Sequence, residues 1–155
     1  MSSMSGPGPT GHTLPEIEPI QALWRGAVTA LVVALPAGIL NQFLVDSGEI
    51  SAGSPFALLF WVLILFGGAA GGWAVIRLSP AARLSYAAAA GALAYAVVQG
   101  VGVIKRLIQG DSISWLAFPL LAVLMATCAM LGGMYARRWL EQNSRNDQNE
   151  PRGTT

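Results

Sequence analysis

The chain has 155 residues, of which 54% are hydrophobic and only 11% are charged. A water-soluble domain carries about 25% charged residues, so this sequence has too little charge to cover a water-facing surface and favours lipid as its surroundings. The formal net charge of +1, without a basic or acidic tract, gives no support to nucleic-acid binding. The single cysteine, Cys128, excludes an intramolecular disulfide.

Two polar segments flank the apolar part of the sequence. Residues 1–20 contain Ser, Gly, Pro, Glu and His12 but no Lys or Arg, so they lack the positive start of a secretory signal. Residues 141–155 hold nothing that could build a core. We therefore predict a disordered N-terminal tail at 1–20, a membrane domain at 21–140 and a disordered C-terminal tail at 141–155.

Four stretches of the central segment are long and apolar enough to cross a bilayer as helices, which takes about 20 apolar residues each. The four spans are placed at about residues 26–45, 56–76, 84–104 and 115–135. The predicted fold class is therefore all-α: a polytopic membrane protein with four transmembrane helices.

Prolines and glycines mark the limits of these spans. Ser54 and Ser79 each precede a proline, the pattern of a capping residue followed by the first residue of a helix. Pro36 lies in the middle of the first span and predicts a kink there. Gly110 is placed to end the third span.

The basic residues divide unequally between the two sides of the membrane. Lys105 and Arg106 fall on one side, together with Asp46 and Glu49. The side that carries the termini holds five arginines: Arg25, Arg77, Arg83, Arg137 and Arg138. Because the side richer in Lys and Arg is cytoplasmic, we predict a multi-pass protein of the cell membrane with both termini in the cytoplasm.

Small residues recur four positions apart in every span. Within lipid, close packing replaces the hydrophobic effect between helices, and small residues let two backbones approach. One interpretation is a tightly packed four-helix bundle, and the other is that the glycine stripe at residues 67–72 faces a second protein. The helix-packing residues predicted from the GxxxG spacing and its shorter version in the fourth span are Gly67, Gly68, Gly71, Gly72, Gly132 and Gly133.

The sequence also matches itself at a fixed distance. Residues 26–76 match residues 91–141 at an offset of 65, most clearly where the Gly-Gly pair at 67–68 aligns with the pair at 132–133. The match suggests two helical-hairpin repeats, as some transporters have. The alternative is two similar hairpins without functional symmetry.

A few polar residues lie inside or at the ends of the spans, where they are costly and often functional. Tyr95, Gln99 and Arg106 share one face of the third span, while Asn41, with Gln42 beside it, continues the small-residue face of the first. The candidate polar site is Asn41, Tyr95, Gln99 and Arg106. In one interpretation Asn41 and Gln99 bond across helices as structural glue. In the other they form a shallow site for an anionic headgroup or small solute, with Arg106 as the anion contact.

The residues that carry enzyme chemistry are missing from the spans. All eight Asp and Glu lie outside them, and one His and one Cys cannot form a Cys/His metal cluster. No Ser has both a His and a carboxylate placed to activate it, and no phosphate-binding glycine loop occurs. We predict no enzyme activity, and no catalytic, cofactor-binding or metal site.

The sequence resembles the small four-helix bacterial membrane proteins called YrzE-like, whose function is unknown. The resemblance rests on the Gly-Gly pair at 67–68, on "GALAY" at 91–95 and on "MLGGM" at 130–134. It implies an integral membrane protein and no particular activity.

Two functional hypotheses follow from these observations. The first is a non-enzymatic component of the lipid bilayer that packs against itself, as a homo-oligomer, or against another membrane protein. The alternative is a small oligomeric transporter or channel for a small solute or anion. A water-accessible cavity around Gln99, Asn41 and Arg106 would favour the second hypothesis, and a dry, hydrogen-bonded core would favour the first.

Overall fold

Four helices make up most of the described part of the protein. The computed structural model describes residues 17–51, 53–110 and 117–149, and no strand occurs in these residues. The helices are α1 (Pro19–Asp46), α2 (Pro55–Leu78), α3 (Leu84–Gln109) and α4 (Ala117–Asn149). Each contains a segment long and apolar enough to span a bilayer. The predicted fold class, an all-α membrane protein with four spanning helices, is confirmed.

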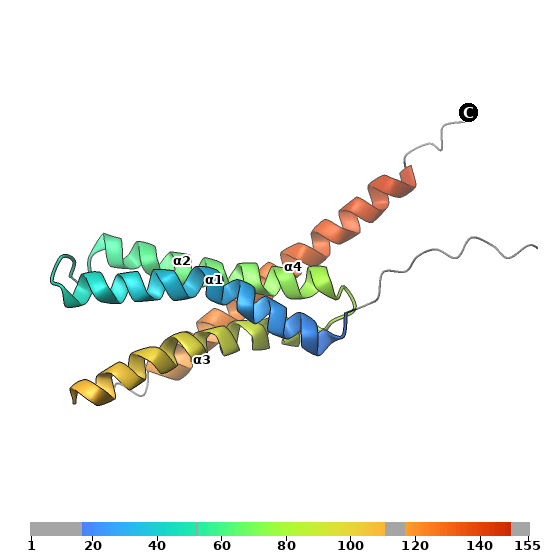
Figure 1. Ribbon diagram of the computed structural model, residues 1–155. Helices are drawn as coiled ribbons and strands as arrows, with labels where there is room; N and C mark the ends of the chain where they lie inside the picture. Colours follow the sequence, from blue (N-terminus) through green and yellow to red (C-terminus); the bar gives the residue numbers. More distant parts are fainter. Residues whose placement is uncertain (1–16, 52, 111–116, 150–155) are drawn as a thin grey trace, which may run out of the picture.

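The helices form a bundle that is closed at one end and open at the other. In the described residues α2 contacts all three other helices, α3 also contacts α1 and α4, and α1 and α4 do not touch. Figure 1 shows α3 diverging from α1 and α2 toward the turn that follows α1. We call this the loop end, and we call the opposite end, where α1 begins and residues 79–83 join α2 to α3, the terminal end.

The core is built from small residues, and the large apolar side chains point outward. Of the eighteen buried apolar residues in the described part of the chain, thirteen are alanines. Phe43, Phe56 and Phe66 are instead 64–67% exposed. In water such a surface would be an aggregation hazard, whereas in lipid the large side chains are solvated by acyl chains and the small ones let the helices approach.

One glycine pair of α2 faces α1. A Cβ atom on Gly71 would lie 2.6 Å from the carbonyl oxygen of Gly26, and a Cβ atom on Gly67 would lie 3.0 Å from that of Ala30. Two helix backbones approach this closely only where a side chain is absent. Gly67 and Gly71 therefore lie within this chain's own α1–α2 contact.

The other face of α2 meets α4. A Cβ atom on Gly72 would overlap the carbonyl oxygen of Ala129, and a Cβ atom on Gly132 would overlap that of Ala69. The two helices thus meet through matching Ala-x-x-Gly segments, residues 69–72 of α2 and 129–132 of α4. Equivalent positions of these segments are sixty residues apart. Since the sequence match has an offset of 65, this crossing does not pair the matched residues, and the hairpin repeat stays a prediction.

The remaining two predicted packing glycines lie against side chains rather than backbone. The Met125 sulfur would lie 2.7 Å from a Cβ atom on Gly68, and the Ala87 Cβ would lie 3.1 Å from one on Gly133. All four glycines at residues 67–72 are buried. This stripe could reach a second protein only if α2 separated from α1 and α4.

The serine–proline pairs have different roles in the structure. Ser54 is the N-cap of α2, and its hydroxyl accepts a hydrogen bond of 3.2 Å from the Ala57 N–H. Ser79 instead ends α2, donating its N–H to the Val75 carbonyl, and α3 begins only at Leu84. The prediction that Ser79 caps the start of a helix was wrong, because a turn follows it, in which the Ala82 N–H bonds to the Ser79 carbonyl, before α3 begins.

Helix α4 is longer than predicted. Residues 141–149 continue it, so the predicted disordered tail was wrong for these residues. They lack apolar residues but include Glu, Gln and Arg, which have good helix propensity, and no proline lies between Pro119 and Pro151. Figure 1 shows this part of α4 extending beyond the other helices. Residues 150–155 lie outside the described part of the chain.

Helix α1 also begins earlier than its predicted span. Pro19 occupies its first turn, where a missing N–H costs nothing, so residues 19 and 20 belong to the helix. Residues 1–16 of the predicted N-terminal tail lie outside the described residues. The helix continues through Pro36 and changes direction along its length, as Figure 1 shows.

Contacts made by arginine side chains join the elements at the terminal end. The Arg137 Nη2 atom on α4 donates a hydrogen bond of 2.9 Å to the Ala82 carbonyl in the α2–α3 connection. The Arg77 guanidinium carbon lies 4.7 Å from the Trp73 ring centroid and 5.7 Å from that of Trp139, within the range of cation–π attraction.

Candidate functional site

Three of the four residues of the predicted polar site line one cavity at the loop end. This polar cavity has a volume of about 240 Å³ and lies between α1, α2 and α3. Asn41 and Gln42 come from α1, Trp61 comes from α2, and Tyr95 and Gln99 come from α3. Its other lining residues are Gly38, Val45, Asp46, Ile64, Val98 and Gly102.

The cavity begins where α1 and α3 stop packing against each other. A Cβ atom on Gly38 would lie 3.3 Å from the Val98 Cγ1 atom, which marks a close approach of the two helices. Asn41 lies about one turn beyond Gly38. Gly102 likewise lies about one turn beyond Val98, and nothing closer than 3.9 Å would meet a Cβ atom there. Because the helices diverge past this contact, their polar side chains border a space.

Several side-chain oxygen atoms lie around this space, and two of them have no hydrogen-bond partner among the described residues. The Gln42 Oε1 and Gln99 Oε1 atoms would each lie 3.9 Å from a Cβ atom on Gly102. Asn41 Oδ1 and the Tyr95 hydroxyl are enclosed and have no hydrogen-bond partner among the described residues. A buried polar group without a partner costs about 1–3 kcal/mol, so the polar cavity is a locally unstable part of the bundle.

The interpretation of Asn41 and Gln99 as interhelical glue is not supported by these contacts. Among the side-chain hydrogen bonds of the described residues, none joins Asn41 to Gln99. The two residues instead border the same cavity. A ligand or water would satisfy them where the opposite helix does not.

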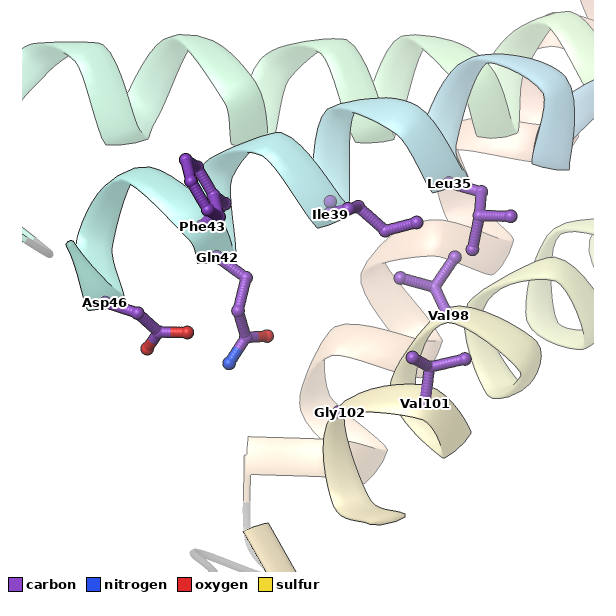
Figure 2. Close-up of a pocket in the computed structure, with 9 residues that line it drawn as sticks. Leu35, Ile39, Gln42, Phe43, Asp46, Val98, Val101 and Gly102 are labelled. Atoms are coloured by element: carbon purple, nitrogen blue, oxygen red, sulfur yellow. The ribbon is translucent and has the colours of Figure 1, made fainter. Parts of the chain in front are cut away.

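A second cavity adjoins the first. It has a volume of about 250 Å³, lies between α1 and α3, and shares five lining residues with the polar cavity. We call it the side cavity. Figure 2 shows Gln42 and Asp46 extending from α1 toward the part of α3 that carries Val98 and Gly102, while Leu35 adds an apolar wall. Gln42 and Asp46 thus border both cavities.

An apolar groove lies between α3 and α4. It has a volume of about 560 Å³ and includes Ala96 and Gly100 of α3 and Pro119 of α4 among its lining residues. Tyr95 and Gln99 line this groove as well as the polar cavity. These two side chains therefore stand between the polar cavity and the apolar groove.

The fourth predicted site residue, Arg106, belongs to α3, but its side chain lies outside the described part of the structure. Its role as an anion contact stays a prediction. Among the described residues that line the polar and side cavities, Asp46 is the one charged side chain.

Two chemically notable residues that line the polar cavity, Trp61 and Asp46, were not assigned to the candidate site by the sequence analysis. Trp61 counted there as one more apolar residue of the second span, and Asp46 as a loop carboxylate. The available signal for Trp61 was its position, since it lies seven residues into α2, deeper than a tryptophan at the membrane interface is expected. Asp46 is the last residue of α1, which brings its carboxylate to the edge of the cavity.

No family model matches this chain, and no curated protein or solved structure matches it. The resemblance to YrzE-like proteins therefore stays a prediction. The fold itself identifies a multi-pass membrane protein, and its function has to be argued from the cavity.

Proposed function

We propose that this membrane protein binds a small polar solute in the polar cavity and acts as a small transporter or channel. The observation that supports the proposal is the cavity itself, in which polar side chains from α1 and α3 and an indole from α2 surround a space at the loop end. Polar groups within a membrane span usually mark a path or a binding site.

The two ends of the bundle differ in a way that suits transport. At the terminal end, contacts such as Gly71 with Gly26 bring the helices backbone to backbone. At the loop end, α1 and α3 diverge. A binding site closed toward one side and open toward the other is one state of an alternating-access cycle.

We propose a non-enzymatic role, because the amide and indole side chains of the cavity would bind a solute by hydrogen bonds and van der Waals contacts without changing it chemically. The proposed orientation places both termini in the cytoplasm. It is supported by arginines such as Arg25, Arg77 and Arg137 at the terminal end. In this orientation the polar cavity faces the outer side of the membrane.

Flux through liposomes tests this proposal. Vesicles carrying the purified protein should take up at least one class of small cationic, neutral or anionic solute faster than protein-free vesicles. Gln99→Leu removes a polar lining group and should lower the initial rate by about tenfold. The matched control is Gln142→Leu on the exposed end of α4, which should leave the rate unchanged. Folded protein without flux of any solute class would contradict the proposal.

A second candidate function, packing against a second copy or another membrane protein, is supported by one surface of α3. Ala96 is exposed, and a Cβ atom on Gly100 would meet nothing within 4 Å. These small residues, four apart, leave room for the backbone of another helix. This face remains open in the single chain, whereas the glycines of α2 are already covered.

Gly100→Leu tests the second candidate. If α3 forms an interface between copies, the larger side chain should shift the purified protein from oligomer toward monomer by about tenfold in dissociation constant. Light scattering coupled to size-exclusion chromatography measures this shift. Val123→Leu, on an exposed position of α4, is the control. A wild-type protein that is strictly monomeric and carries no copurifying partner would rule this candidate out.

A further inference from the structure

We infer that the polar cavity takes a small organic cation with N–H donors, such as an alkylammonium, rather than an anion. This inference rests on the proposed function and names the class of its solute. What carries it is the set of oxygen acceptors that α1 and α3 bring together at the loop end.

The oxygen atoms around the cavity need hydrogen-bond donors. Gln42 Oε1 on α1 and Gln99 Oε1 on α3 both lie near Gly102, each 3.9 Å from the position of a Cβ atom there. Asn41 Oδ1, from the preceding position on α1, has no partner among the described residues. An ammonium group offers three N–H donors and no acceptor, so it complements several carbonyl oxygens at once, whereas a carboxylate or phosphate would require the amides to turn their NH2 groups toward the cavity.

Tyr95 is an independent indication that a ligand belongs here. Its side chain lines the cavity, is only 6% exposed, and keeps its hydroxyl without a partner in the described residues. Buried tyrosines usually find a partner for this group. A bound solute would supply the missing partner once the ring turns toward it.

The aromatic groups of the cavity also favour a cation. No Lys, Arg or His is among the described residues that line the polar and side cavities. Trp61 and Tyr95 provide aromatic rings, whose faces attract organic cations. The amide and phenol oxygens carry the argument, and the aromatic rings add to it.

The size of the cavity selects an organic cation over a bare metal ion. Its volume of about 240 Å³ is several times the ~30 Å³ that a water molecule occupies in the liquid. Val45, Ile64 and Val98 line the remaining space with apolar groups. A short alkyl chain attached to the ammonium group would contact them.

Three probes of similar size but different charge test the inference: propylammonium, propionamide and propionate. Each is titrated calorimetrically into the full-length protein in lipid nanodiscs. Propylammonium should bind at least about tenfold more tightly than the other two. Gln99→Glu should tighten its binding and Gln99→Leu should weaken it by about tenfold, while Gln142→Leu should bind as the wild type does.

The opposite charge response would overturn the inference. If propionate binds best and Gln99→Glu weakens it, the cavity is an anion site, and the proposed transport function survives. If propionamide and propylammonium bind equally well, charge has no role in recognition. The inference then fails, and the proposed transport function survives. If propylammonium does not bind, the inference fails, and the proposed function fails with it only if the liposomes also show no flux. Asn41→Asp replaces Gln99→Glu should the latter variant not fold.

Discussion

Replacing Gly72 with leucine should abolish the folded bundle. A Cβ atom at this position would overlap the carbonyl oxygen of Ala129, which belongs to the backbone of α4. No side-chain rotation can relieve this overlap, so α2 and α4 would have to separate. Overpacking usually costs about 1–3 kcal/mol, and here we expect more than about 3 kcal/mol because the whole helix contact is lost.

The measurement is the thermal unfolding of the detergent-purified protein, together with its elution as a single folded species. Gly100→Leu is the matched control, because it makes the same substitution on α3 where a Cβ atom meets nothing within 4 Å. Its monomer should unfold near the wild-type temperature. A Gly72→Leu protein that unfolds like the wild type would show that α2 and α4 do not approach as described.

Substitution by alanine should distinguish a glycine of α2 that packs against a side chain from one that packs against a backbone. Gly68→Ala should cost less than Gly72→Ala, because the nearest atoms to a Cβ on Gly68 belong to the flexible Met125 side chain. The same unfolding measurement ranks the two variants. Equal losses would mean that Met125 is held as rigidly as the backbone of α4.

The membrane fold could be predicted from the sequence because each span carries its own signal. Length and hydropathy identify a helix in lipid without any knowledge of its neighbours. The cap at Ser54 was predictable for the same reason, since its bond to Ala57 is local. Ser79 was misjudged because Ser-Pro can end one helix or begin the next, and the turn at residues 79–83 decides between them.

The C-terminal part of α4 shows a different limit of sequence analysis. Residues 141–149 lack apolar residues, which predicts that they build no core, and the exposure of 141–146 agrees with that. The absence of a core does not require disorder, because a helix can extend from a packed segment through residues of good propensity. Composition alone did not separate these two outcomes.

The partners of the glycines could not be predicted from their spacing. The pairs Gly67–Gly71 and Gly68–Gly72 have the same four-residue interval and lie about 100° apart around the helix. Only the tertiary arrangement assigns one pair to α1 and the other to α4. The spacing predicts close packing, and it does not say which helix, or which protein, is the neighbour.

The candidate polar site was predictable to the extent that polar residues stand out in apolar spans. Asn41, Tyr95 and Gln99 were found in this way, and the structure places them around one cavity. That they border a cavity rather than bond to each other depends on the divergence of α1 and α3. Trp61 joins them for the same reason, and no pattern within α2 alone indicates it.

Removing two polar groups of the cavity together should stabilise the protein and eliminate solute binding. Asn41 Oδ1 and the Tyr95 hydroxyl are enclosed without partners among the described residues. Replacing such groups with apolar ones of similar shape relieves their desolvation cost, so Asn41→Leu combined with Tyr95→Phe should raise the stability by about 2 kcal/mol. The same change removes two contacts to a solute and should weaken propylammonium binding by about a hundredfold.

Thermal unfolding and calorimetric titration of the same nanodisc sample measure the two effects side by side. Tyr135→Phe, at an exposed position of α4, should change neither. Opposite changes in stability and binding are the mark of a site that is kept at a cost to the fold, and a purely structural polar pair would not produce them. If the double variant loses stability, the two groups have hydrogen-bond partners in the folded protein, and the cavity between α1 and α3 is a packing feature rather than a binding site.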